Sequence, residues 1–212
     1  MLISTALDRN IEKALAAVRN HPQHDLNLGY RQGIWAAFGS KDDSKTSDNS
    51  GHKRRATLAI LVARYVLPIW DAIWSDDDTP HRLITTAEQV LNRTIDVKTA
   101  RYYRDEVWTK LENLASEPEH QKPEYQKAIN AGFAAINALS SALYDEEFDP
   151  DNINYNLTDA DVDSYESDSS FWAAAAYSNG SIWEPNSDTT KRRKFWEWWL
   201  TEAVPKAWQA LS

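Results

Sequence analysis

Residues 53–75 read KRRATLAILVARYVLPIWDAIWS, and this stretch decides the fold class. Its apolar side chains recur three and four positions apart, at Leu58, Leu61, Val62, Tyr65, Val66, Ile69, Trp70 and Ile73. That spacing is typical of an amphipathic helix with a wide buried face. Pro68 lies inside the pattern, where it removes one backbone hydrogen bond and predicts a kink.

The same periodicity continues on both sides of this helix. It predicts further helices over residues 5–20, 27–38, 80–93, 97–115, 123–144, 169–178 and 189–211. Thr79 suits the N-cap of the helix that begins at Pro80, and Asp96 suits the N-cap of the next one. A second kink is expected at Pro205. Short connections between helices predict an all-α fold, an antiparallel bundle of about six to eight helices.

The composition limits the class of protein. The chain has 212 residues and no cysteine, so it suits one helical domain, residues 1–212, without disulfides or thiolate metal sites. Its N-terminus has no basic segment followed by an apolar run, and no stretch approaches the roughly 20 apolar residues of a membrane helix. We therefore expect a cytoplasmic location and no membrane partner. Residues 40–51 lack apolar side chains and predict a flexible loop.

The negative charge is concentrated in one segment. Ten acidic residues and no Lys or Arg lie between Asp145 and Ser170, whereas the remaining 22 acids are balanced by the 23 basic residues. We interpret residues 145–168 as a solvated acidic loop, which would repel nucleic acid and could attract a basic partner. A calcium loop is an alternative, because Asp159, Asp161 and Asp163 match the first EF-hand ligands. Ser164 and Ser170, however, replace the required Gly and Glu.

The C-terminal helix combines a basic run with tryptophans. Residues 191–194 read KRRK and residues 195–200 read FWEWWL. Trp196 and Trp198 point roughly in opposite directions on a helix, so one face cannot bury both. Either neighbouring helices enclose this helix, or part of its aromatic surface contacts a partner. The basic run lies at the unfavourable end of the helix dipole, and we expect the acids of 145–170 to compensate it.

No motif for catalysis is evident. The chain has no GxSxG nucleophile elbow and no HExxH zinc motif, so we predict no catalytic residue, metal or cofactor. A polar group follows the 53–75 helix and contains Asp71, Asp76, Asp77, Asp78, His81 and Arg82. Helix capping explains such residues. The alternative is an enzyme or small-molecule binder with Asp71, Asp77, His81 and Arg101 around a cleft.

One stretch also resembles a known family. Its residues are the run ARYVLPIWD at 63–71, then Asp77-Asp78, Pro80, Ile84, Ala87 and the turn Ile95-Asp96-Val97. This pattern is similar to the fifth immunity-protein family of bacterial polymorphic toxin systems. The segments Phe195-Trp196-Glu197-Trp198-Trp199 and Ala203-Val204-Pro205 are similar to its longer members.

The resemblance implies a small all-helical cytoplasmic antitoxin that binds and blocks a cognate toxin domain, often a nuclease. The absence of catalytic motifs predicts that the protein is not an enzyme. Its net acidity and the lack of a broad basic stripe predict no direct binding of nucleic acid. We expect a monomer or homodimer. The family pattern carries Arg64, Pro68, Trp70, Asp71, Asp77 and Pro80, which either define the fold or contact the toxin. The other candidate partner-binding residues are Asp159, Asp161, Asp163, Trp196 and Trp198.

Overall fold

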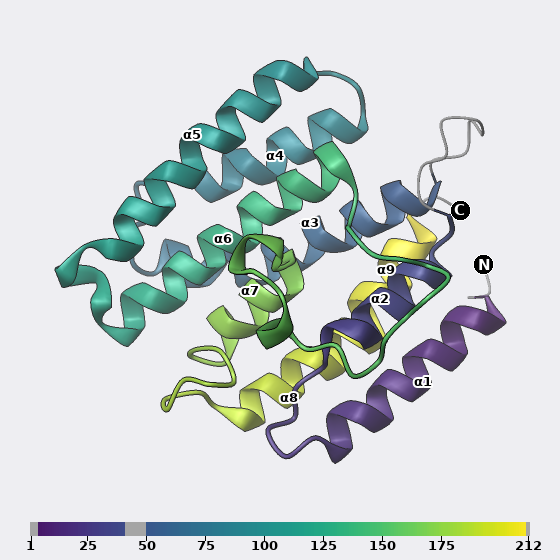
Figure 1. The fold of residues 1–212 in the computed structure, drawn as a ribbon. Helices are drawn as coiled ribbons and strands as arrows, with labels where there is room; N and C mark the ends of the chain where they lie inside the picture. The colour runs from purple at the N-terminus through teal and green to yellow at the C-terminus, as the bar shows by residue number, and fades with distance from the viewer. Residues whose placement is uncertain (1–3, 41–49, 211–212) are drawn as a thin grey trace.

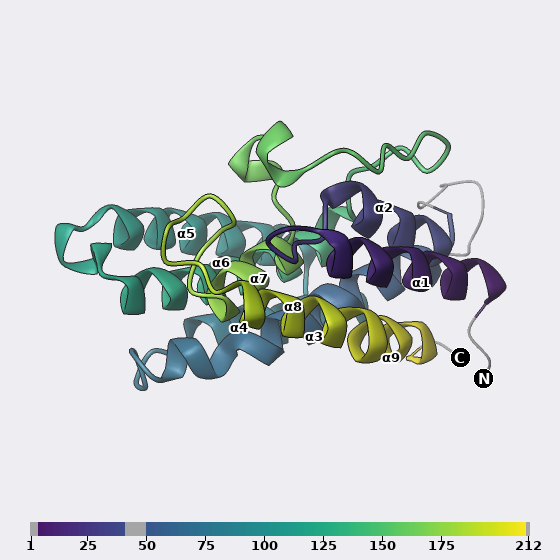
Figure 2. The same cartoon turned by 90° about the horizontal axis from the view of Figure 1, so that it is seen from below.

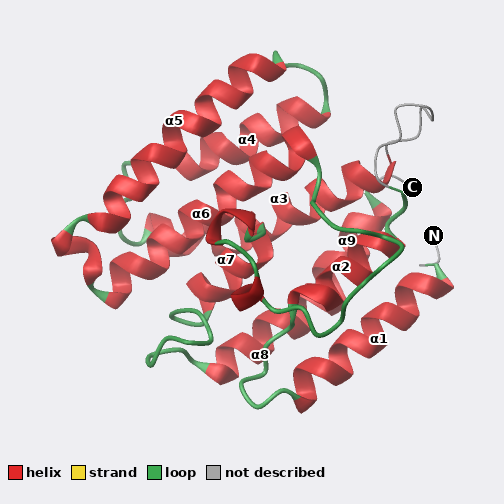
Figure 3. Ribbon diagram, viewed as in Figure 1, coloured by secondary structure: helices red, strands yellow, loops and turns green. Residues whose placement is uncertain are grey.

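The computed structural model describes residues 4–40 and 50–210, and in these ranges it contains helices and no strand (Figure 3). The helices are α1 (Thr5–Asn20), α2 (Leu28–Ala37), α3 (Ser50–Asp71), α4 (Thr79–Leu91), α5 (Val97–Ser116), α6 (Pro123–Tyr144), α7 (Ser169–Tyr177), α8 (Thr189–Trp198) and α9 (Val204–Gln209). This confirms the predicted all-α fold. None of the described helices is long and apolar enough to span a bilayer.

Helix α6 forms the centre of the molecule. It contacts α3, α4, α5 and α7 and is surrounded by them (Figure 1). Small residues make this possible: a Cβ atom at Gly132 would lie 2.9 Å from Cδ2 of Leu111 and 3.0 Å from Cζ3 of Trp70. The interior is therefore close-packed through the alanines and the glycine of α6.

Helix α3 has the predicted buried face and continues through its proline. Leu58, Val62, Val66 and Trp70 are buried, whereas Pro68 is exposed. The helix extends three residues beyond Pro68 to Asp71, four residues short of the predicted end. A bend at Pro68 stays a prediction. The loop predicted over residues 40–51 ends too late in the sequence, because Ser50 and Gly51 belong to α3. Residues 41–49 of that loop lie outside the described ranges.

The turn before α4 differs from the prediction in one detail. Thr79 is the first residue of α4 rather than its N-cap, and Asp78 precedes it without a side-chain cap. Instead, the Asp77 carboxylate accepts a hydrogen bond from the Thr79 backbone N–H at 2.9 Å. At α5 the prediction is confirmed, since the Asp96 carboxylate accepts from the Thr99 N–H at 2.9 Å.

The C-terminal helix is interrupted by a π-helical turn. Residues Trp199–Ala203 form this turn between α8 and α9, and the Val204 N–H donates to the Trp199 carbonyl. Pro205 follows one residue later, in the first turn of α9. A π turn shifts the hydrogen-bond pattern by one residue. The kink expected at Pro205 stays a prediction. Leu211 lies outside the described residues.

Segment 145–168 connects α6 to α7 and crosses the outer side of α2 (Figures 1 and 2). The Gly29 N–H donates to the Leu157 carbonyl at 3.1 Å. A Cβ atom at Gly29 would lie 1.9 Å from the Asn154 carbonyl oxygen, so only glycine allows this approach. The segment contains two short 3₁₀ turns, Asp159–Asp161 and Ser164–Glu166. It is therefore docked on the helices, which corrects the prediction of a solvated loop.

Candidate protein-binding surface

Arg31 holds the second half of the acidic segment against the helices. It lies on the buried face of α2 and is itself fully buried. Its Nε donates to the Asp168 carboxylate at 2.9 Å and its Nη1 to the Asp159 carboxylate at 3.0 Å. Burial raises the pKa of Asp159, while the Arg31 charge opposes this effect. The prediction that Asp159 is a solvated, calcium-binding or partner-binding residue is wrong, because its carboxylate is buried against Arg31.

Arg55 of α3 holds the first half in the same way. Its Nε and Nη2 donate to the two carboxylate oxygens of Asp145 at 2.6 and 2.7 Å, a bidentate pair. Its Nη1 donates to the carbonyls of Trp35 and Gly39 at 3.0 and 2.9 Å. The two buried arginines therefore neutralise three of the ten acids inside the molecule.

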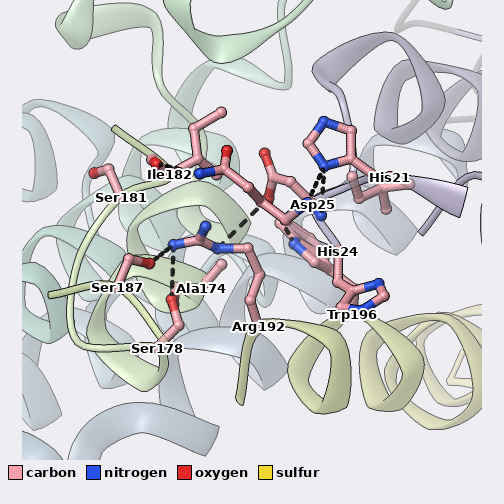
Figure 4. Close-up of polar contacts among 12 residues, drawn as sticks. His21, His24, Asp25, Ala174, Ser178, Ser181, Ile182, Ser187, Arg192 and Trp196 are labelled. Carbon is pink, nitrogen blue, oxygen red and sulfur yellow. Dashed lines mark hydrogen bonds and ion pairs between the residues drawn. The ribbon is translucent and has the colours of Figure 1, made fainter. Parts of the chain in front are cut away.

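A third buried arginine ties the basic run of α8 to the interior (Figure 4). Arg192 donates to the Gly180 carbonyl at 2.7 Å and to Ser178 Oγ at 3.2 Å, and its Nε lies 3.9 Å from Asp25. Asp25 also accepts a hydrogen bond from Trp196 Nε1 at 2.9 Å. The charge of Arg192 is thus compensated by Asp25 and not, as predicted, by the acids of 145–170. Trp196 is buried, which agrees with the alternative that neighbouring helices enclose this helix and not with a direct contact of Trp196 to a partner.

The acids that remain face the solvent. Six of the ten are exposed: Glu147, Asp149, Asp151, Asp161, Asp163 and Glu166. Asp161 accepts hydrogen bonds from the backbone and side chain of Thr158, and Asp163 accepts from the Tyr165 N–H at 3.0 Å. The contacts of Asp161 are to Thr158, which carries no charge. The surface of the segment is therefore strongly acidic.

A cavity of about 710 Å³ lies beneath this acidic surface. Residues of α2, α5, α6 and segment 145–168 line it. Glu146 lies half-buried in it and accepts a hydrogen bond from the Ser141 hydroxyl. Burial, together with the negative charge of Asp168, raises the pKa of Glu146 to about 8. This carboxyl group is therefore largely protonated at neutral pH.

Aromatic side chains extend from the cavity along the same face. Tyr165 stacks on Trp108, with ring centroids 5.6 Å apart, and Trp108 contacts Phe133 at 5.7 Å. The series continues through Trp172 and Phe171 to Trp183. Tyr165 is 65 % exposed and Trp183 is 56 % exposed, so the row reaches the surface at both ends. Exposed Tyr and Trp beside a charged rim are typical of protein interfaces.

The comparison with protein families assigns the chain. The family model described as immunity protein Imm5 matches residues 11–206. The chain belongs to the Imm5 immunity protein family. This confirms the resemblance seen in the sequence, and the match includes the acidic segment as well as the tryptophan-rich α8. No curated protein shows a significant match to the chain.

In this Imm5 protein the motif run 63–71 of α3 organises the turn after it. Trp70 Nε1 donates to the Asp77 carbonyl at 2.8 Å, and Lys110 donates to the Asp77 carboxylate at 2.8 Å. Partial burial raises the pKa of Asp77, but the hydrogen bonds from Lys110 and Thr79 outweigh it and hold the value below normal. Trp70 and Pro80 are buried. These motif residues therefore determine the fold of the turn.

Two other motif residues lie on the surface. Arg64 donates to Glu88 at 2.7 Å, and Asp71 lies 2.9 Å from His81 Nε2. Trp198 is half-buried and stacks on Tyr65, with ring centroids 3.7 Å apart. Arg64, Asp71 and Trp198 therefore keep surface that a partner could contact, and their role in binding stays a prediction.

The alternative cleft after the third helix gains no support from the geometry. Asp71, Asp77, His81 and Arg101 line neither the 710 Å³ cavity nor a shallower one of about 470 Å³ beside α1. The side chains of His81 and Asp71 are 47 % and 43 % exposed. The acidic cavity beside α5 and α6, which sequence reasoning missed, is formed by residues more than 100 positions apart in the chain, such as Gln32 and Glu146.

One group of potential metal ligands was also missed. Glu117, Glu119 and His120 place one ligand atom each within 4.8 Å of one another. The signal was present in the sequence as the ExxH spacing of Glu117 and His120. Glu117 Oε2 already contacts His120 Nδ1 at 3.0 Å, and both glutamates are exposed. The contact between Glu117 and His120 accounts for this arrangement.

Proposed function

We propose that the protein neutralises a cognate toxin domain by direct binding, and that the toxin docks on the face that carries the acidic cavity and the aromatic row. Membership of an immunity protein family supports a toxin as the partner. We place the toxin on this face because of the negative charge at the rim of the cavity. Glu147 and Glu166 line the cavity without an ion-pair partner among the described residues.

An uncompensated acidic rim favours a basic partner surface. Complementary charge accelerates association, and buried aromatic side chains slow dissociation. A nuclease presents a basic cleft to the phosphates of its substrate. We propose that the acidic rim occupies such a cleft in the toxin, in the cytoplasm of a bacterium that carries both genes. The inhibitor itself then needs no catalytic group.

Co-purification with the toxin domain encoded by the neighbouring gene tests this function. We expect a stable complex on a sizing column and protection of cells that express the toxin. A wild-type chain that neither co-elutes with the toxin nor protects the cells would contradict the proposal. The same column separates a 1:1 complex from one built on a homodimer.

Charge reversal tests the choice of face. The double variant Glu147→Lys/Glu166→Lys should slow association about tenfold, because it replaces attraction by repulsion at the rim. The matched control is Glu12→Lys/Glu124→Lys, which changes the net charge equally at exposed positions of α1 and α6 outside the cavity lining. Equal effects of the two variants would place the interface elsewhere.

A further inference from the structure

The cavity contains buried amide groups with unused hydrogen-bonding capacity. Gln32 is 9 % exposed, and its side chain has no hydrogen-bond partner among the residues that the structure describes. Asn137 is 7 % exposed; its Nδ2 donates to the Phe133 carbonyl at 2.9 Å, while its Oδ1 accepts from no described residue. Neither amide is among the fully buried side-chain groups that lack a hydrogen-bond partner, so the free amide atoms are open to the cavity. Their carbonyl oxygens are therefore available to a ligand that offers hydrogen-bond donors.

The charges of the side chains that line the cavity indicate whether the ligand is positively or negatively charged. The one cationic side chain of the described lining, Arg104, donates to Asp105 at 2.8 Å. Asp145 and Asp168 are neutralised by Arg55 and Arg31 from behind the wall. Two charged glutamates, Glu147 and Glu166, then remain without an ion pair among the described residues, and Glu146 adds a third negative charge once it loses its proton. The cavity therefore favours a cation.

The size and the walls of the cavity limit what that cation can be. Its volume of about 710 Å³ greatly exceeds that of a single ion and accommodates an amino-acid side chain with adjoining backbone. Trp35, Trp108 and Tyr165 contribute to the walls. Aromatic faces attract guanidinium and ammonium groups. A guanidinium also carries five N–H donors, which suit carboxylate and amide acceptors on several sides.

We propose that the cavity is the receptor for a basic side chain, an arginine or lysine presented by the bound toxin, which enters between the carboxyl group of Glu146 and the amides of Gln32 and Asn137. This inference rests on the proposed function, since it assigns the source of the side chain to the toxin. It adds a specific anchoring contact at the centre of the acidic rim.

Binding at this place is coupled to a proton. Glu146 lies close to the acids Asp168 and Asp145 and to the guanidinium of Arg55, which is already paired with Asp145. Glu147 and Arg104 line the same cavity, and Arg104 is paired with Asp105. At neutral pH its carboxyl group is largely protonated, because its pKa is raised to about 8. A cation that docks against it favours the carboxylate, so the proton leaves to solvent. The affinity for the cation therefore rises as the pH rises toward about 8.

Two peptides test the site without the toxin. The probe is acetyl-Gly-Arg-Gly-amide, and its control contains citrulline, the neutral isostere of arginine. We monitor the side-chain amide signals of Gln32 and Asn137 by NMR. We expect saturable shifts with the arginine peptide and none with the citrulline peptide. Glu146→Gln should weaken arginine binding about tenfold, the effect of losing one charged hydrogen bond, and should abolish its pH dependence.

Asp151→Asn is the matched control variant. It removes one acid of the same segment at an exposed position outside the cavity, and should bind the arginine peptide as the wild type does. Absent or equal shifts with the two peptides, or an affinity unchanged in Glu146→Gln, would overturn the inference. If Glu146→Gln fails to fold, the difference in binding between the arginine and citrulline peptides on the wild type still tests the inference.

The toxin complex separates this inference from the function on which it rests. Toxin binding that keeps its affinity and pH dependence in Glu146→Gln overturns the cavity inference and leaves the immunity function standing. A wild-type chain that discriminates the two peptides but binds no toxin overturns the proposed function, and with it the toxin as the source of the basic side chain.

Discussion

At the scale of single residues, three buried arginines organise the chain. Arg31, Arg55 and Arg192 have at most 1 % of their surface exposed. Burying a charge is costly unless acids and carbonyl groups compensate it, and each of these guanidinium groups has such partners. The partners of Arg31 and Arg55 lie in segment 145–168. These side chains therefore act as internal cross-links that hold the acidic segment in place.

Removal of Arg31 should destabilise the fold strongly. Arg31→Met leaves Asp159 and Asp168 buried without their counter-charge, so we expect the free energy of unfolding to fall by about 3–5 kcal/mol. Urea denaturation followed by circular dichroism measures the change. The control is Arg64→Ala, which removes an exposed pair with Glu88 and should cost less than about 1 kcal/mol. Similar losses in both variants would contradict a special role for the buried arginine.

Glu146 should make the stability depend on pH in an unusual direction for an acid. Its pKa is raised from the ordinary value of 4.5 to about 8 in the folded state, so the folded state binds more protons than the unfolded state between these values. The contribution of protonated Glu146 to the free energy of unfolding is therefore complete below about pH 4.5 and is lost as the pH rises to about 8. Relative to Glu146→Gln, the wild type should therefore lose stability between pH 5 and 8. If the unfolding temperatures of the two proteins change equally with pH over this range, the raised pKa of Glu146 is contradicted.

At the scale of elements, the arrangement of the bundle depends on small residues in α6. A helix of alanines and one glycine lets α3 and α5 approach it closely, and Trp70 and Leu111 contact the position that lacks a side chain. The C-terminal helix is shaped by a π turn and not by small residues. Its π turn at Trp199–Ala203 allows Pro205 to follow without ending the helix, while Trp199 and Leu200 remain buried.

Gly132→Ala tests the close approach of the helices. Alanine has the higher helix propensity by about 1 kcal/mol, but its methyl group would meet Leu111 and Trp70 at 2.9 and 3.0 Å. Overpacking of this kind costs about 1–3 kcal/mol, so we expect a net loss of stability. Chemical denaturation with two-state analysis measures it. A gain in stability would show that the packing around α6 is looser than the structure indicates.

At the scale of the whole molecule, one face combines net negative charge with exposed aromatic rings. The buried arginines neutralise the acids at the two ends of segment 145–168, so that the exposed acids and the rim of the cavity carry the surplus charge. Tyr165 and Trp183 reach the solvent at opposite ends of the aromatic row. This combination suits a partner that is both basic and able to cover aromatic side chains.

Loss of the exposed rings should shorten the lifetime of the toxin complex. Tyr165→Ala/Trp183→Ala should raise the dissociation rate about thirtyfold, in line with a loss of about 2 kcal/mol at an interface anchor. Both rings are more than half exposed, so the free protein should keep its stability. Surface plasmon resonance gives the rate, and Tyr102→Ala, 74 % exposed on α5 outside the aromatic row, is the control. An unchanged dissociation rate would exclude these rings from the interface.

Much of the architecture followed from the sequence alone. The all-α class and the approximate helix boundaries were predictable, because helical periodicity is a property of residues three and four positions apart. The family motif around Trp70 and Asp77 could also be recognised in the sequence, because its residues are close together in the chain and contact one another in the turn between α3 and α4. Cap residues such as Asp96 were predictable for the same reason, since a cap contacts residues only two or three positions away.

The role of the acidic residues was decided only by the tertiary structure. Asp159 and Asp163 are four positions apart and look alike in the sequence, yet one is buried against Arg31 and the other is exposed. The reason is distance along the chain. Arg31 and Asp159 are 128 positions apart, and Arg55 and Asp145 are 90 apart. No local pattern can predict which acids a distant arginine will neutralise, and hence which charges stay free to attract a partner.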